Sequence, residues 1–251
     1  MNCEKAFSIS FGSLLLLLTI SITAVAQSTT NFTIGYGFEK IRYGDGIRTI
    51  ISDYNQHNRE ENNIATDTLT APDWLHGIII GFKLSGEKIT SGCELHMPSH
   101  QSVATGTLAI DGSSYYKRIK IGHVGLAPFF GINFFHWKKL RSGPMLGLNL
   151  DKYRLMDSEY KPFTNFSYNR YIDRVHLSLS LKWPISIGGN KFSFDIIPYY
   201  TMPFWRINLS PFNEGLNEGY FTMYNDNLMI YKPMVFGVSV TLNFVVKKIE
   251  E

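Results

Sequence analysis

The sequence MVFGVSVTLNFVV, from Met234 to Val246, decides the fold class. Large apolar residues alternate there with small or polar ones. The apolar set is Phe236, Val238, Val240, Leu242, Phe244 and Val246, and the other set is Gly237, Ser239, Thr241 and Asn243. Because successive side chains of a β-strand point to opposite faces, this period of two predicts a strand with one apolar and one polar face.

Similar patterns recur along the chain and predict an all-β fold with eight strands. An even number is typical of single-chain bacterial membrane barrels. Lys117, Arg118 and Lys120 blur the alternation of the fourth strand, and residues 129–137 either extend it or pack beneath it. The predicted strands are 31–43, 75–85, 88–104, 115–127, 144–153, 174–187, 190–202 and 234–246.

The connections between these strands differ in length. Long ones are expected at 44–74, 154–173 and 203–232, and tight ones at Gly86-Glu87 and Gly188-Gly189. Outer-membrane barrels have short periplasmic turns and longer extracellular loops. We therefore expect a closed eight-stranded antiparallel up-and-down transmembrane β-barrel with its long loops on one rim. The connection 128–143 is expected on the rim with the short turns, but it is longer than a short turn.

The two tight turns also predict a register. Two-residue hairpin turns set Ile187 opposite Asn190 and Ser85 opposite Lys88. Lys182 then faces Asp195 on the polar side. Because an unpaired buried charge is costly, we expect charge pairs to fill the barrel interior. The charged residues involved are Lys182, Asp195, Glu39, Lys83, Glu94 and Asp151.

The N-terminus has the pattern of a secretory signal. Lys5 precedes an apolar stretch at 11–22, which is followed by Ala24, Val25 and Ala26. A basic start, an apolar stretch of this length and a small-residue cleavage site are typical of signal peptides. We predict cleavage after Ala26, so that residues 1–26 are the signal and residues 27–251 form one barrel domain.

Composition narrows the function further. The formal net charge is only +3 and the basic residues are scattered, so we expect no nucleic-acid partner. Cys3 lies before the apolar stretch, which argues against a lipid anchor, and Cys93 alone cannot form an internal disulfide. The apolar stretch 124–135 is broken by glycine and proline, so only a closed barrel would carry this chain across a bilayer.

Alternation alone fits two kinds of barrel. A soluble exported ligand carrier would turn the apolar faces inward, whereas a membrane barrel turns them toward lipid. The unequal loops favour the membrane barrel, as do tall aromatic residues near the expected interfaces and small residues on the polar face. The aromatic residues are Tyr36, Trp74, Trp183, Tyr200 and Phe244, and the small ones are Gly35, Gly37, Ser178, Ser180, Gly237 and Ser239.

With this signal, these strands and these loops, the chain resembles the small bacterial outer-membrane β-barrel proteins of the OmpA-like, OmpX-like and OmpW-like size class, and it is most similar to those of Bacteroidota. The resemblance rests on pattern over nearly the whole mature chain. It implies an outer-membrane location, with lipid and the outer-membrane assembly machinery as partners. Members usually end on an aromatic residue that this machinery reads, whereas here Phe244 is followed by residues 245–251.

His176 and Ser178 are the one candidate for catalysis, because they share a face of a strand. Outer-membrane lipid A deacylases use a His-x-Ser arrangement on a small barrel, so a lipid-modifying hydrolase is the enzymatic alternative. Such a mechanism needs an acidic residue to orient the histidine. In the predicted register the nearest one, Asp195, is roughly 20 Å from His176. We therefore expect a structural polar pair and no enzymatic activity.

The remaining histidines show no spacing that a transition metal requires, so we expect no metal or cofactor. They are His57, His76, His96, His100, His123 and His136.

The leading hypothesis is a non-catalytic structural, adhesive or interaction protein without a wide pore. An eight-stranded barrel is just wide enough for side chains to fill its interior. Its long loops would contact an extracellular protein or glycan, and tyrosines such as Tyr171 and Tyr220 are candidate contact residues.

One helix is expected within the first long connection, at residues 44–58. Ile47, Ile50, Ile51 and Tyr54 recur there at helical spacing. The helix is either a lid or docking element at the barrel mouth, or a loop segment that only caps the rim.

Overall fold

The computed structural model describes residues 29–42, 46–60, 65–107, 112, 114–160, 167–189, 191–217 and 230–248. The predicted signal, residues 1–26, lies outside these ranges, as does most of the connection around Asp111. Tyr220, a candidate contact residue, also lies outside them.

Eight long strands pair side by side in a ring, which confirms the all-β class. Their order is β14-β1-β3-β4-β5-β8-β9-β11, and β11 pairs in turn with β14. Each pairing between these strands is antiparallel. The bounds are β1 Thr29–Arg42, β3 Leu75–Ser85, β4 Ile89–Thr107, β5 Ser114–Ile132, β8 Met145–Tyr160, β9 Ser167–Lys182, β11 Phe192–Pro203 and β14 Met234–Lys248.

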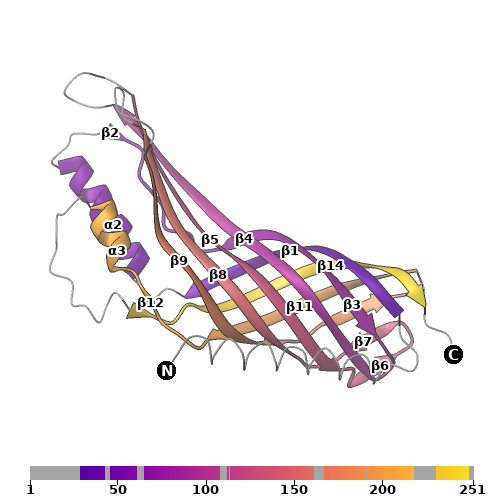
Figure 1. Cartoon of the computed structure of the whole chain (residues 1–251). Coiled ribbons are helices and arrows are strands. Elements are labelled where there is room, and N and C mark those ends of the chain that lie inside the picture. Colours follow the sequence, from indigo (N-terminus) through magenta and orange to yellow (C-terminus); the bar gives the residue numbers. More distant parts are fainter. Residues whose placement is uncertain are drawn as a thin grey trace.

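Shorter elements lie at the two ends of the ring (Figure 1). One end carries the helices α2 (Gly46–Glu60) and α3 (Ser210–Leu216), beside the projecting tips of β4, β5, β8 and β9. In the described ranges neither helix is long and apolar enough to cross a bilayer. The opposite end carries β6 (Phe135–Trp137) and β7 (Leu140–Ser142), and β7 pairs with β10 (Ile185–Gly188). The remaining short strands are β2 (Ala65–Thr66), β12 (Ile207–Asn208) and β13 (Ile230–Tyr231).

The apolar faces of the strands point outward. Phe194, Phe236 and Leu242 are 36%, 54% and 42% exposed, whereas the alternating Thr241 and Asn243 are buried. Every one of the eight long strands has at least one exposed large apolar side chain. The soluble carrier with an inward apolar pocket is therefore wrong for this ring, and the outward-facing expectation is confirmed.

Two predicted registers are wrong by an even number of residues. Ile185 lies opposite Ile196 instead of Phe192, a shift of four, and Ser85 lies opposite Thr90 instead of Lys88, a shift of two. Both turns lie further along the chain than predicted, because the Gly86 N–H donates to the Ile89 carbonyl at 2.8 Å and the Gly189 N–H donates to the Phe192 carbonyl at 3.0 Å. Because side chains alternate with period two, an even shift changes the partners and leaves every residue on its predicted face.

Two connections differ from the prediction. Residues 154–160 and 167–173 belong to strands and not to a loop, since β8 continues to Tyr160 and β9 starts at Ser167. The long connection 128–143 is explained in part by β5, which extends to Ile132, and then by the β6–β7 hairpin. This hairpin widens the sheet at the short-turn end by pairing with β10.

The close approach of strands predicts a specific sensitivity at Gly35. A Cβ there would lie 2.3 Å from the backbone oxygen of Val240 on β14, whereas nothing lies within 4 Å of a Cβ at Gly189. We expect Gly35→Ala to destabilise the folded protein by about 1–3 kcal/mol, the usual cost of overpacking. Gly189→Ala is the matched control and should change little. Urea unfolding in detergent micelles measures both, and equal midpoints would contradict the packing described here.

Candidate functional site

The interior of the ring holds a buried polar cluster contributed by four strands. Glu39 on β1 accepts a hydrogen bond from the Tyr199 hydroxyl on β11, at 2.6 Å, and contacts His123 Nε2 on β5, also at 2.6 Å. The other ring nitrogen of His123 lies 3.5 Å from Asp151 on β8. All four side chains are buried. Burying charge is favourable only with such partners, so this cluster ties opposite sides of the ring together.

A second group of buried charges lies nearer the short-turn end. Lys182 on β9 donates to Glu94 on β4 at 2.5 Å, and Glu94 also contacts His96 Nε2 at 3.0 Å. Lys83 on β3 pairs with Asp195 on β11. The expected charge pairs therefore exist, but the predicted partnership of Lys182 with Asp195 is wrong. The four-residue register shift separates these two residues along β9 and β11.

Side chains fill the interior at this level. The cavity between Glu39, His123, Lys182 and their neighbours measures about 10 Å³. This is about the space that one water molecule needs. An eight-stranded ring filled in this way leaves no passage here for a solute.

His176 and Ser178 both face this interior and do not form a nucleophile pair. Ser178 donates its hydroxyl hydrogen bond to Asp151, which lies opposite His176 across β8 and β9. Neither ring nitrogen of His176 has a hydrogen-bond partner within the described part of the chain. Its ring packs edge-on against Tyr153, with centroids 5.3 Å apart. The prediction missed Asp151 as the nearest acidic residue because it considered only the β9–β11 register.

In the described ranges no group of three or more His, Cys, Asp or Glu side chains is placed to hold a metal ion.

Above the polar cluster, at the long-loop end, the inner face becomes apolar. Helix α2 is confirmed where the sequence predicted it, and its apolar stripe is buried against α3 and the inner faces of the projecting strands. We call this apolar assembly the cap. Its buried residues are Ile47, Ile50, Ile51, Tyr54, Leu69, Leu75, Ala104, Ile119, Ile121, Tyr153, Leu155, Ile172, Ile207, Leu209, Phe212 and Leu216.

Hydrogen bonds and an ion pair fix the cap to the strands. The Asn55 side chain bonds both the backbone N–H and the carbonyl of Leu69, at 2.9 and 2.8 Å. Lys117 on β5 pairs with Asp157 on β8 at 2.7 Å, and both are almost fully buried. Tyr171 donates to Asp157 at 2.8 Å and packs against Phe212. Tyr171 is therefore a partly buried support of α3, contrary to its predicted role in a loop surface.

The sequence prediction missed α3. Leu209, Phe212 and Leu216 follow helical spacing, and Pro211 falls in the first helical turn, where proline is favourable. At seven residues the helix is too short to be stable alone, so its packing against α2 and β9 must hold it.

No family model matches this chain, and no curated protein does. Two solved structures of Ail, the attachment invasion locus protein of Yersinia pestis, match with TM-scores of 0.40 and 0.38 at 8% and 9% identity. Each match covers 88% of this chain and 99% of the Ail chain, and the second structure is a complex with the heparin analogue sucrose octasulfate. At these scores the matches establish neither a family nor a function.

The Lys182–Glu94 pair generates a prediction about stability. Lys182→Met leaves the Glu94 carboxylate buried with only His96 as partner, and breaking a buried pair in this way costs about 3–5 kcal/mol. The double variant Lys182→Met/Glu94→Gln removes both charges and should recover most of that loss. Urea unfolding of the refolded protein measures these two variants and the single variant Glu94→Gln. If the two substitutions are additive, the two side chains are not coupled as described.

Proposed function

We propose that this chain is a non-catalytic outer-membrane β-barrel that acts through its long-loop end. In this proposal the signal is cleaved after Ala26, the ring closes as a transmembrane barrel, and lipid surrounds its outer face. The outer-membrane assembly machinery inserts it, and an extracellular protein or glycan binds the loop end. The observation that carries the proposal is the apolar outer belt around a buried polar interior.

Aromatic residues bound this belt on both sides. Toward the short-turn end, one outward row crosses four neighbouring strands and consists of Phe192, Phe244, Phe32 and Phe82. Toward the long-loop end, Tyr200 and Phe236 are paired on β11 and β14. The two rows lie eight residues apart on both strands, roughly 27 Å along a strand and about 20 Å along the axis of a barrel with ordinary tilt. Membrane barrels carry an apolar band about 25 Å tall between aromatic girdles, so this spacing is of the same order.

The extent of exposed apolar surface supports the same proposal. Soluble monomers rarely expose large contiguous apolar patches, and this belt runs across adjacent strands. In a bilayer the same side chains are in contact with acyl chains, while the backbone polar groups are satisfied by pairing around the ring. The filled interior supports a role other than general diffusion.

The loop end offers an ordered surface for a partner. Arg48, Ser52 and Gln56 are exposed along α2, on the side opposite its buried isoleucines, and Glu214 is exposed on α3. The cap holds both helices in place, so a partner would meet a preformed surface, which reduces the entropic cost of binding.

Fractionation and conductance test the membrane assignment. We expect the protein in the membrane pellet after a carbonate wash, with heat-modifiable migration on a gel. In planar bilayers the same purified protein should show no large stable conductance, because side chains close the interior. A chain that is freely soluble without detergent would contradict the membrane assignment, and a large conductance would contradict the closed interior.

The role of the loop end is tested with a variant in which α2 no longer packs in the cap and the ring stays folded. Ile50→Asp places a charge in the apolar cap, so we expect cleavage by trypsin within α2 to be at least about tenfold faster. Cells displaying this variant should also lose adhesion to glycan-coated and protein-coated surfaces, with carbonate fractionation unchanged. Ser52→Asp, on the exposed side of the same helix, is the control for proteolysis. Equal adhesion by the unmodified protein and the Ile50→Asp variant would contradict the proposed role. So would a lack of adhesion by the unmodified protein.

A further inference from the structure

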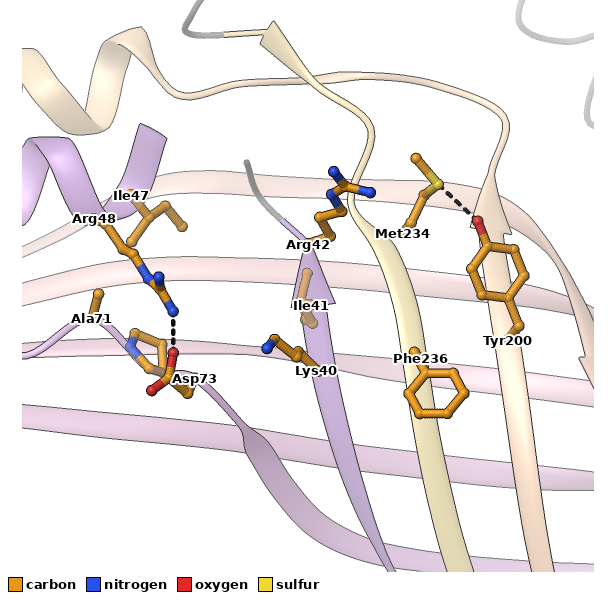
Figure 2. Close-up of a pocket in the computed structure, with 11 residues that line it drawn as sticks. Lys40, Ile41, Arg42, Ile47, Arg48, Ala71, Asp73, Tyr200, Met234 and Phe236 are labelled. Atoms are coloured by element: carbon orange, nitrogen blue, oxygen red, sulfur yellow. Dashed lines mark hydrogen bonds and ion pairs between the residues drawn. The ribbon is translucent and has the colours of Figure 1, made fainter. Parts of the chain in front are cut away.

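A pocket lies on the outer side of the ring, where β1 and β14 meet the long-loop end. It measures about 440 Å³ and lies between the end of β1, the start of β14, the start of α2 and residues 71–73. In Figure 2, Lys40 and Arg42 on β1 lie between two walls. Arg48 and Asp73 form one wall, and Phe236 and Tyr200 form the other.

Positive charge predominates in this pocket. Its lining includes three cations, Lys40, Arg42 and Arg48, and one carboxylate, Asp73. Asp73 pairs with Arg48, and the side chains of Arg48 and Asp73 are 60% and 62% exposed. Lys40 and Arg42 are exposed, and neither forms an ion pair with an acidic residue in the described ranges. Two cations therefore remain to attract an anion.

The position of these cations along the ring axis indicates which class of anion they bind. Lys40 lies opposite Phe236 in the β1–β14 ladder, and Phe236 lies opposite Tyr200, so Lys40 is level with the upper aromatic row. Arg42 lies opposite Met234, one outward position further from the belt. Below Lys40 on the same face are Phe38 and Tyr36, both exposed. The outward face of β1 thus changes from apolar to cationic where a bilayer changes from acyl chains to headgroups.

We propose that this pocket binds the phosphorylated headgroup of an outer-leaflet glycolipid of the lipid A class. Lys40 and Arg42 would contact phosphate, with charge-assisted hydrogen bonds of the kind that both side chains make to phosphate oxygens. The acyl chains of the same lipid would lie along Phe38 and Phe236. The inference rests on the proposed membrane placement, and it assigns a specific lipid contact to one side of the ring.

Phosphate is the shared chemistry of a lipid headgroup and a free anion, but the pocket has features that only a lipid uses. Its wall continues directly into the apolar belt through Phe236 and Tyr200. A free phosphate gains nothing from these aromatic residues, whereas the acyl chains of a lipid bury apolar surface against them.

The experiment measures lipid binding to the full mature chain, folded in a non-ionic detergent, by native mass spectrometry. The probes are lipid A with both phosphates and the same lipid with its phosphates removed. Lys40→Gln/Arg42→Gln removes the two cations of the pocket that have no acidic partner in the described ranges. Lys138→Gln/Lys139→Gln is the matched control, because it removes two exposed cations from the opposite end of the ring.

We expect the unmodified protein and the control variant to prefer the phosphorylated lipid. With each cation near a charged lipid surface contributing about a fivefold effect, the Lys40→Gln/Arg42→Gln variant should bind this lipid about 25-fold more weakly. Its affinity for the dephosphorylated lipid should stay unchanged. Inorganic phosphate at 100 times the lipid concentration should not displace the lipid, since acyl contacts also hold it.

The contrary outcomes separate the two proposals. Equal affinity of the unmodified protein and the Lys40→Gln/Arg42→Gln variant for phosphorylated lipid A would overturn the pocket assignment. Displacement by inorganic phosphate would overturn a lipid as the occupant. Heat-modifiable migration is checked in each preparation. A folded, detergent-bound protein with no phosphate preference overturns only this inference, whereas a protein that is soluble without detergent overturns the membrane placement as well.

Discussion

The antiparallel pairing that runs round the ring is the constraint on which the rest of the structure depends. Because β14 pairs with β1 on one side and with β11 on the other, side chains have only two directions, the enclosed interior and the outer face. The interior is too narrow for bulk water, so its polar groups must satisfy one another. Thr33 with Asn243, at 2.8 Å, and Ser180 with Asn149, at 3.0 Å, do so between adjacent strands.

The same inner faces serve two chemistries along their length. On β8 the inward residue Asp151 belongs to the polar cluster, and the next inward residue, Tyr153, belongs to the cap. On β5 the corresponding change is from His123 to Ile121. The change from charged to apolar packing thus takes place between two successive inward-facing residues of a strand. It separates an interior held by a cluster of buried charges from a loop end held mainly by burial of α2 and α3, with the Lys117–Asp157 pair as its buried ion pair.

Much of this arrangement is predictable from alternation, because alternation fixes the face of each residue. The strand at 234–246, the buried Glu39 and Glu94 and the helix carrying Ile50 all follow from periodicity alone. Pairing partners do not, since alternation does not fix where each tight turn lies along the chain. Moving a turn by one residue shifts the register by two, and every even shift preserves the faces. This is why the buried charges were correctly placed inside while the Lys182–Asp195 pairing was wrong.

The loop end was harder to predict for a different physical reason. Residues 154–160 carry Arg, Asp, Ser and Glu, a composition typical of loops, yet they continue β8 because Asp157 has Lys117 as a buried partner and Leu155 lies in the cap. A strand stabilised by one long-range ion pair leaves no local signal. Helix α3 did leave one, in the spacing of Leu209, Phe212 and Leu216, but it is short and lies in a connection otherwise rich in polar residues.

The projecting strands have a mechanical consequence. His76 lies opposite Ser99 at the level of Phe38, and β4 continues for eight residues beyond Ser99 to Thr107. That is roughly 27 Å of paired strand, or about 20 Å of height at ordinary tilt. In the proposed orientation these hairpins form a stiff stalk that rises above the lipid surface. Sugar chains of neighbouring glycolipids would crowd its flanks, and its summit would be the part that an approaching cell or macromolecule touches first.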